Sequence, residues 1–532
     1  MKKQNKMGGF FTQAIGFFPL VFLVVILYFA RHSMADAFAR WGEERPVGEG
    51  EPLLEHHVFV QDQYYRRDVT EPGERVELEQ GTLSVQHYSG SDLAVTEMVF
   101  ELENGDVYHH TQIPFSEYLA DFNQYKLIIN YEFVNGWVTY FDPEEQEWVY
   151  NRRLRSGVSF PMTMAFVNIE NETYLVFDQP YAYSQGRDGN IIAHDDKMGR
   201  IFINPRGYGF DFVIGFPMTE GVHTEMWTLE SKEPLVDMEN PEASILTGET
   251  YAEFWQRCCY GPEHRFLMDG YYTRTPESYS GYQENAFWRN PGVHLPYNYI
   301  LNGKDRASHD LGYIQLYLSS RNMNEAGYFP TEPESTWLKE TYGIPGGYYD
   351  TRFNADMGVA LVKAYQKYDE PYFLEQATKM LSFYADFARK NHYTFYNELS
   401  EEGWLVQDYW HEELSGEPVH SALNHQIQEM HFLYLLGEEL GDPEITELGD
   451  KLLKGVEITR DVWIKPEGDL HYGYTPEGLF DRQDYPDLTY NDMYRVQELL
   501  VSTGRSRNES LDLLMKAKKS YMDAAGITTY LR

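Results

Sequence analysis

The sequence predicts an α+β protein of several domains, with an N-terminal transmembrane helix, an antiparallel β-sandwich or barrel, and a C-terminal α/α toroid that is incomplete. Three observations predict it: an uncharged apolar run near the N-terminus, short alternating strands with turn residues between them, and a helix–turn–helix pattern that recurs after residue 250. The 532 residues suffice for roughly two or three domains with full cores. The predicted parts are a cytoplasmic tip and anchor at 1–31, a spacer at 32–57, a β-rich domain at 58–240 and the toroid at 250–532.

The N-terminal segment predicts where the protein resides. Three lysines among the first six residues precede the stretch 7–30, which carries no charge and is mostly apolar. This stretch is longer than the ~20 residues that a helix needs to cross a bilayer, and the lysines are expected to stay in the cytoplasm. We therefore expect a single-pass membrane protein whose C-terminal domains are extracellular. A cleaved signal peptide is the alternative, since Ala35–Ala37 resembles a cleavage site.

Composition limits the classes of partner. The formal net charge is −39, and this excludes a nucleic acid partner, because phosphate binding needs a basic surface. Aromatic residues make up 16% of the chain. Most are expected in the core, but Tyr and Trp also suit sugar binding, since they combine a flat apolar face with a polar group. The adjacent Cys258 and Cys259 are interpreted as buried apolar residues rather than a redox or zinc site.

The region from 58 to 240 shows the two-residue alternation of β-strands. Turn-forming segments at 103–106, 134–136 and 187–190 interrupt the runs. Short runs with such breaks are typical of antiparallel β structure. The predicted strands include Arg75–Glu79, Leu93–Leu102, Leu127–Phe133, Trp137–Phe141, Met164–Val167, Tyr174–Phe177 and Phe210–Phe216.

After residue 250 the apolar period becomes helical. In two of three successive pairs of predicted helices, the first helix ends in an acidic turn and a proline begins the second. Stacked hairpins of this kind predict an α/α toroid, and the remaining region 250–350 is too short to complete the ring. The predicted pairs are Met357–Tyr368 with Pro371–Arg389, Val419–Leu440 with Pro443–Arg460, and Leu488–Thr503 with Glu509–Ala524.

Two segments that connect these hairpins, 404–413 and 471–485, are rich in aromatic and titratable side chains. A polar aromatic cleft suits a carbohydrate chain, because sugars present apolar faces and hydroxyl edges. Tyr and Glu could also serve there as acids or bases if their neighbours shifted their pKa values. For Glu412 and Glu413 a charged surface is the plainer interpretation. The candidates are Trp404, Tyr409, His411, Glu412, Tyr472 and Tyr474.

Polar residues at two predicted helix starts are candidates for substrate binding. Arg352 follows Asp350 and Thr351, either of which could cap the helix, and its fork of donors suits a carboxylate. Asn424 and His425 open the next inner helix, where a buried polar network between helices is the alternative to binding. We expect no metal and no cofactor, because the sequence has no phosphate loop, no nucleophile elbow and no convincing zinc pattern.

Three stretches of the C-terminal half carry a resemblance to a known family. Tyr409–Asn424 leads from a Tyr-Trp-His-Glu-Glu segment into a Leu-Asn helix start, Leu433–Gly455 is a Leu-rich hairpin, and Asp487–Gly504 ends in Ser-Thr-Gly. In these stretches the chain resembles the C-terminal domain of D-glucuronyl C5-epimerases, which invert uronic acid residues within heparan-type chains. The order of anchor, β domain and toroid is also similar to that family.

The resemblance implies a mechanism and roles for the candidate residues. A uronate is held by its carboxylate, a Tyr or Glu removes the proton next to it, and a second acid on the opposite face returns one. The expected partner is a polysaccharide or oligosaccharide, and self-association into a homo-oligomer is left open. The resemblance implies catalysis by Tyr409, Glu412, Tyr472 and Tyr474, and substrate binding by Arg352, Asn424, His425, Trp404, His411 and Tyr490.

Other functions are compatible with the same predicted fold. A polysaccharide lyase would begin with the same proton removal and then eliminate the linked sugar. A glycoside hydrolase would need two carboxylates across the scissile bond, for which Glu412 and Asp487 are candidates. A surface glycan-binding or assembly protein without turnover is the non-enzymatic alternative.

Overall fold

The computed structural model describes residues 55–531 with internal gaps. These residues belong to one compact unit, Leu54–Arg532. The predicted anchor at 1–31 and nearly all of the predicted spacer lie outside the described residues. Among the residues that are described, no helix has the length and apolar character of a membrane span. The gaps are 61–62, 65–68, 72, 90–93, 114–123, 134, 143–144, 156, 158–162, 170–172, 179, 187–190, 195–199, 207–208, 218–220, 238–240, 242–249, 260–264, 275–285, 292–293, 333 and 415.

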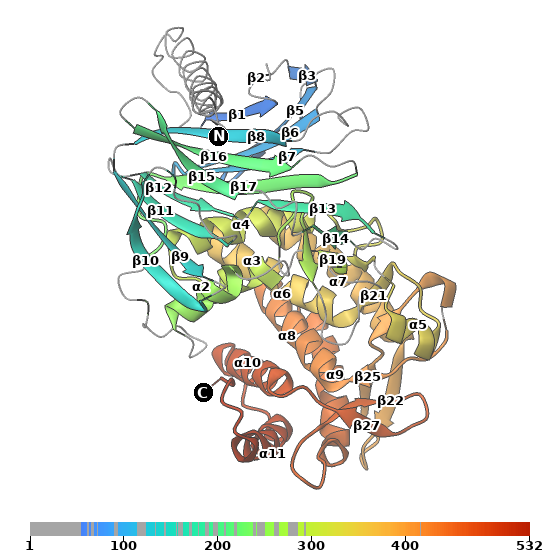
Figure 1. Ribbon diagram of the computed structural model, residues 1–532. Helices are drawn as coiled ribbons and strands as arrows, with labels where there is room; N and C mark the ends of the chain where they lie inside the picture. The colour runs from blue at the N-terminus through green and yellow to red at the C-terminus, as the bar shows by residue number, and fades with distance from the viewer. Residues whose placement is uncertain are drawn as a thin grey trace, which may run out of the picture. The chain divides into compact units, whose positions relative to one another are not determined.

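The β-rich part consists of two antiparallel sheets (Figure 1). The smaller sheet has the strand order β15-β16-β8-β1-β2, and the larger contains fourteen strands. Phe177 of the larger sheet packs on Phe212 of the smaller, with ring centroids 4.9 Å apart, as in a sandwich. The smaller sheet comprises β1 (Glu55–Val60), β2 (Gln63–Tyr64), β8 (Gln124–Phe133), β15 (Arg200–Arg206) and β16 (Gly209–Pro217).

The larger sheet confirms most of the predicted strands to within a few residues. The predicted break at 134–136 falls between β8, in the smaller sheet, and β9, in the larger. Strands β18 and β19, which follow residue 250, were not predicted. This sheet comprises β3 (Val69–Glu71), β4 (Arg75–Leu78), β5 (Gly81–Ser89), β6 (Ala94–Leu102), β7 (Val107–Ile113), β9 (Gly136–Asp142), β10 (Glu147–Arg153), β11 (Ala165–Ile169), β12 (Thr173–Phe177), β13 (Tyr181–Gln185), β14 (Ile191–Ala193), β17 (His223–Ser231), β18 (Tyr271–Arg274) and β19 (Ala286–Pro291).

The helical part confirms all six predicted hairpin helices, and capping explains their limits. Asp350 caps α6 by accepting from the Phe353 amide at 3.0 Å, and Pro371 opens α7 after the cap Glu370. Cys258, in α2, is buried in the core that these helices share, as the sequence predicts. The described helices are α2 (Tyr251–Cys259), α3 (His294–Asn302), α4 (Arg306–Ser320), α5 (Thr336–Tyr342), α6 (Thr351–Tyr368), α7 (Pro371–Lys390), α8 (Leu423–Leu440), α9 (Pro443–Trp463), α10 (Leu488–Ser502) and α11 (Glu509–Ala525).

One predicted helix start is wrong. Helix α8 begins at Leu423, not at Val419, because Ser421 and Ala422 pair with Tyr474 and Gly473 as a short strand. Three small sheets of this kind connect the helices. They consist of β20 (Pro330–Thr331), β21 (Tyr348–Asp350) and β24 (Tyr409–Trp410); of β22 (His392–Tyr396) and β23 (Glu402–Val406); and of β25 (Ser421–Ala422), β26 (His471–Tyr474) and β27 (Phe480–Gln483).

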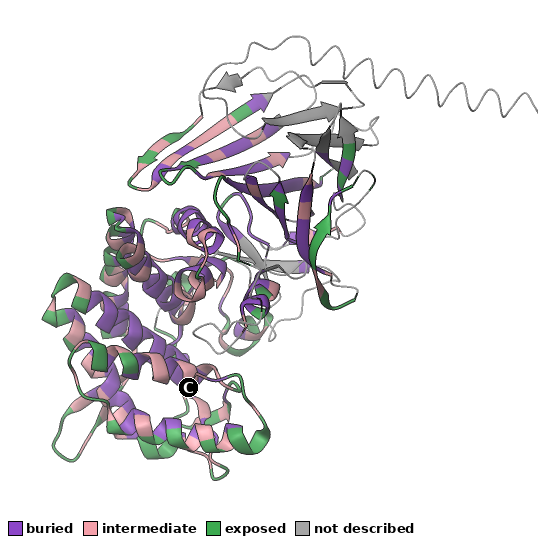
Figure 2. Ribbon diagram, turned by 90° about the vertical axis from the view of Figure 1, so that its left-hand side faces the viewer, coloured by how far each residue is buried: buried purple, intermediate pink, exposed green. Residues whose placement is uncertain are grey.

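The hairpin helices form two rows. Helices α6, α8 and α10 contact one another in an inner row, and each is followed in the chain by a partner that packs on it, α7, α9 or α11. The faces along which helices touch are buried and the outward faces are exposed (Figure 2). The inner helices run in the same direction, since residues near their starts contact one another. Thr351 of α6 lies 2.9 Å from His425 of α8, and Arg352 of α6 pairs with Asp492 of α10. Strands β21 and β25 lead directly into α6 and α8, so the small sheets gather at the amino ends of the inner row.

Partly buried polar contacts join the β-rich and helical parts. The Arg306 guanidinium pairs with Asp106 at 2.5 Å, and Gln80 donates to the Tyr368 carbonyl at 2.9 Å. Glu370, the cap of α7, also accepts from the Glu79 amide at 2.9 Å. The cap of an outer helix thus also fixes the edge of the large sheet.

Candidate active site

Aromatic and imidazole rings gather where the inner helices begin. They come from α5, β24, the residue just before β25, the first turn of α8, and β26. We call this group the ring cluster, and it consists of Trp337, Tyr342, Tyr409, His420, His425 and Tyr472.

His420 is the centre of the ring cluster. Its ring lies 5.4 Å from those of Trp337 and Tyr409, and 5.7 Å from that of Tyr472. The ring of Tyr342 stacks on it at 5.5 Å, with 28° between the planes. His420 is buried, whereas Trp337, Tyr342 and Tyr472 are only half-buried. The cluster therefore has a closed interior and aromatic rings that reach the surface.

A buried carboxyl group lies behind the rings. Asp408 is fully buried; its Oδ2 lies 3.2 Å from Nε2 of His420, and its Oδ1 lies 3.7 Å from Nδ1 of His425. The Ala422 amide donates to Oδ1 at 2.8 Å. Burial raises the pKa of Asp408 well above its usual value and lowers the pKa of His420 to about 3. Burial thus disfavours a charge on either group.

An ion network lies next to the cluster and joins the three inner helices. Arg352 on α6 donates to Asp356 at 3.1 Å and to Asp492 on α10 at 2.5 Å, and it also reaches the Asn424 carbonyl on α8 at 3.2 Å. Asp492 is fully buried, and only 12% of the Arg352 side chain is exposed. Arg352, predicted to bind a substrate carboxylate, therefore already carries two carboxylates of the chain itself.

A second arginine lies at the ring cluster. The guanidinium carbon of Arg482 lies 4.9 Å from the centre of the Trp337 ring, a cation–π contact. Within the described residues Arg482 makes no ion pair and no side-chain hydrogen bond. Its backbone has a φ of 71°, which a non-glycine residue adopts at an energetic cost that is often found at functional sites.

The structure brings some of the predicted site residues together and separates the others. Tyr409, Tyr472 and His425 belong to the ring cluster, while Arg352 and Asn424 adjoin it through the ion network. Elsewhere, Glu412 is exposed in a short 3-10 turn, and His411 accepts from the Glu413 amide there. Trp404 stacks on His392 in the β22–β23 hairpin, Tyr474 packs on Phe395 and Tyr393, and Tyr490 packs on Tyr530. The roles given to all these residues stay predictions.

Sequence reasoning missed five members of the site: Trp337, Tyr342, Asp408, His420 and Arg482. Trp337 and Tyr342 lie in the region where only further hairpins were expected. His420 was assigned to the start of a helix, and Asp408 precedes the predicted Tyr409. The available signal was the adjacency of polar and aromatic residues just outside a helix, as at Asp408 and Tyr409.

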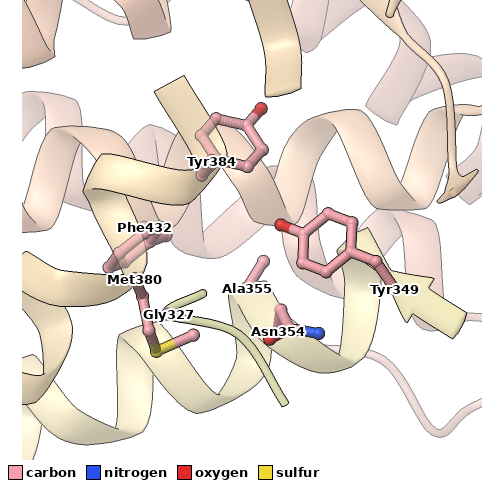
Figure 3. Close-up of a pocket in the computed structure, with 7 residues that line it drawn as sticks. All are labelled: Gly327, Tyr349, Asn354, Ala355, Met380, Tyr384 and Phe432. Carbon is pink, nitrogen blue, oxygen red and sulfur yellow. The ribbon is translucent and has the colours of Figure 1, made fainter. Parts of the chain in front are cut away.

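A small pocket lies apart from the ring cluster, between α6, α7 and α8 (Figure 3). It has room for about one water molecule. The space is too small for a sugar, so we assign it to core packing. Its lining residues are Gly327, Tyr349, Asn354, Ala355, Met380, Tyr384 and Phe432. In the described part of the chain, no group of three or more His, Cys, Asp or Glu side chains is placed to hold a metal ion.

Comparison with known proteins identifies no family for this chain. No family model matches the sequence, and no curated protein matches it. Solved structures that are similar in part include a D-mannose isomerase (15% identity, TM-score 0.31, covering 44% of this chain and 59% of that one) and a sugar epimerase from a ruminal bacterium (12%, 0.31, 43% and 58%). A family 76 glycoside hydrolase from a bovine Bacteroides thetaiotaomicron strain matches at 9% identity and a TM-score of 0.35, over 75% of each chain. The chain spans less than two thirds of the isomerase and the epimerase, and likenesses this distant assign it no activity.

Proposed function

We propose that this chain is a carbohydrate-active enzyme that moves a proton next to the carboxylate of a uronic acid within a polysaccharide, as uronyl epimerases do. The ring cluster carries the proposal. It combines half-exposed aromatic faces, which suit sugar rings, with phenol and imidazole groups that can transfer protons.

The tyrosines supply the proton-transfer groups in this proposal. Tyr409 and Tyr472 flank His420, and burial raises the pKa of Tyr472, an effect that a hydrogen bond with Tyr409 opposes. Tyr472 is therefore protonated at rest and can act as an acid. Tyr474 and Glu412 stay candidates from the resemblance, although they lie outside the ring cluster.

The substrate carboxylate needs a cationic partner. Arg352 already pairs with Asp356 and Asp492, so a uronate would have to compete with two carboxylates for it. Among the described residues, no carboxylate lies within ion-pair distance of Arg482, which is located at the surface of the cluster, over Trp337. We propose that Arg482 provides the local positive charge that a polyuronate requires on a chain with a net charge of −39.

One experiment separates this proposal from its alternatives. The full chain, purified in detergent, is incubated with a panel of uronic acid polysaccharides in deuterated water. Deuterium that enters the sugar ring supports proton transfer, and ultraviolet absorbance from an unsaturated product selects a lyase instead. Chain cleavage without either change selects a hydrolase, and binding without any change selects a glycan-binding protein.

We further propose that residues 1–31 anchor the protein in a membrane and place the ring cluster outside the cell. The uncharged stretch 7–30 supports this proposal. Alkaline carbonate extraction of cell membranes tests it, because an anchored chain stays in the membrane pellet. Release of the intact chain into the supernatant would overturn it.

A further inference from the structure

A line of three polar groups leads from the buried carboxyl group to the surface of the ring cluster. The Tyr342 hydroxyl lies 2.8 Å from Nδ1 of His420, and the other nitrogen of that ring lies 3.2 Å from Oδ2 of Asp408. We propose that Tyr342 is a catalytic acid and base of this site, and that His420 and Asp408 are positioning residues that accept and hold its proton. This inference rests on the proposed function for its substrate, but the geometry of the three groups does not depend on it.

Local structure fixes each member of the line. Tyr342 is the last residue of α5, which ends at Gly343 with a left-handed φ of 73°. Asp408 is held through its main chain, since its amide donates to the His420 carbonyl and its carbonyl accepts from the Thr351 amide, both at 2.9 Å. These main-chain hydrogen bonds therefore hold Asp408 and His420 against each other.

Burial decreases from one end of the line to the other. Asp408 is 0% exposed and His420 1%, while Tyr342 is half-buried. Of the three groups, Tyr342 is thus the one that a ligand can reach. Oδ2 of Asp408 and Nε2 of His420 have no hydrogen-bond partner elsewhere among the described residues, although they face each other. Catalytic contacts that are loose in an empty site often tighten when a ligand binds.

The order of the groups gives the direction of proton transfer. A proton on Nε2 of His420 faces the Asp408 carboxylate and leaves Nδ1 to accept from the Tyr342 hydroxyl. When the phenol O–H bond breaks, an N–H bond forms at Nδ1, and Asp408 neutralises the imidazolium. The phenolate then takes the proton from the sugar carbon next to the carboxylate, and the electron pair of that C–H bond moves into the carboxylate as an enolate.

The cycle closes with protons from the opposite face and from solvent. An acid such as Tyr472 protonates the enolate carbon, which regenerates the carboxylate and inverts the centre. His420 releases its extra proton to solvent, and the second phenol regains one from solvent, so no other reactant is consumed.

The charged and titratable neighbours of Tyr342 have opposite effects on its pKa. Burial raises its pKa first of all; Arg482 lowers it, and Asp408 and Glu477 raise it. Tyr393 also interacts with Tyr342. The phenol therefore stays protonated at rest, and its reactivity depends on His420 as the acceptor rather than on a standing phenolate.

A chemical probe tests the line of groups without a substrate. The full chain in detergent is treated with an aryl sulfonyl fluoride, which forms an O–S bond with tyrosine and releases fluoride, and labelled peptides are quantified by mass spectrometry. Tyr396 is the internal reference, since it is 61% exposed and is not a member of the ring cluster. We expect Tyr342 to be labelled faster than Tyr396 despite its lower exposure.

Variants connect that reactivity to the two buried partners. His420→Gln and Asp408→Asn should each slow labelling of Tyr342, the first by roughly a hundredfold, the lower range of what a general base contributes. Labelling of Tyr396 should not change, which shows that the effect of the variants is specific to Tyr342. Equal labelling of Tyr342 in the parent chain and in both variants would overturn the proposal, as would slower labelling of Tyr342 than of Tyr396 in the parent.

Failure of this proposal is distinguishable from failure of the proposed function. Fast labelling of Tyr342 that needs His420 supports the line of groups even if no polysaccharide exchanges deuterium. Deuterium exchange that persists in Tyr342→Phe, with the rate of the parent chain, overturns the catalytic role of Tyr342 and leaves the epimerase proposal intact.

Discussion

The hydroxyl of Tyr384 on α7 donates a 2.5 Å hydrogen bond to Oε2 of Glu429 on α8, and both side chains are buried. Burial raises the pKa of Glu429 well above its usual value, so its carboxyl group is protonated in the folded protein over a range where the unfolded chain is charged. Stability from Glu429 is therefore complete at pH values below the unfolded pKa of about 4.3 and declines as pH rises above it.

We expect Glu429→Gln to remove this part of the pH dependence. The amide has the size of the protonated acid and accepts the same hydrogen bond from Tyr384, but it cannot ionise. Chemical denaturation of the parent and the variant from pH 4 to pH 9 measures the difference in the free energy of unfolding. The parent should lose stability relative to the variant as pH rises, and parallel curves would contradict the assignment of a buried neutral carboxyl group.

We expect Asp492→Asn to weaken the packing of the inner row strongly. Asp492 is fully buried and holds the Arg352 guanidinium, so the variant leaves a buried cation with less compensation, at a cost of ~3–5 kcal/mol. Asp386→Asn is the matched control, because Asp386 pairs with Lys390 on the exposed face of α7, where a pair contributes about 0.3–0.5 kcal/mol. Equal effects of the two variants on the free energy of unfolding would show that the Arg352 network is not a structural contact.

A buried lysine near the carboxyl terminus predicts a pH-dependent defect. Lys518 lies 2.6 Å from Asp469 and 2.8 Å from Asp484, and all three side chains are fully buried. Burial raises the pKa of Asp484 to about 6, and Lys518 opposes this shift. Lys518→Met should destabilise the chain by ~3–5 kcal/mol at pH 8, because two carboxylates lose their cation.

This defect should become smaller in acid. The folded pKa of Asp484 exceeds the unfolded value of about 3.9, so protonation below pH 6 favours the folded state and relieves the unpaired charge. The measurement is the thermal midpoint of Lys518→Met relative to the parent at pH 8 and at pH 5. A difference that grows in acid would contradict it.

We expect Arg482→Gln to weaken binding of a uronic acid polysaccharide by roughly tenfold, since a hydrogen bond to a charged group contributes about 1.5–3 kcal/mol. Arg389→Gln is the matched control: it changes the net charge equally on an exposed position in the last turn of α7. Isothermal titration at two salt concentrations separates the local contact from the general field. An equal loss in both variants would assign the effect to net charge alone.

We expect Tyr472→Phe to lower turnover more than Tyr474→Phe. Both are tyrosines of β26 and were predicted catalytic, but only Tyr472 lies in the ring cluster, where loss of a proton-transfer group costs ~10²–10⁴-fold in rate. Deuterium incorporation into the sugar is the readout, with Tyr396→Phe as the unchanged control. A larger loss of turnover in Tyr474→Phe than in Tyr472→Phe would place the reaction near Tyr474 instead.

Sequence patterns predict the elements of this fold better than the site. Pro371 and Pro443 mark where two outer helices begin, because an acidic cap followed by proline is typical of a helix start. His420 and Asp408 could not be placed in this way, since each lies just before a strand of only two residues, β25 or β24, which has no detectable period. Tyr342 reaches His420 only through tertiary packing across 78 positions of the chain.

Main-chain hydrogen bonds attach the segments beside the short strands of the site to one another and to the start of α6. The bonds from Thr351 to Asp408 and from Asp408 to His420 join amides and carbonyls, so they persist whichever side chains stand there. The side chains at 408 and 420 can therefore change while these two attachments remain.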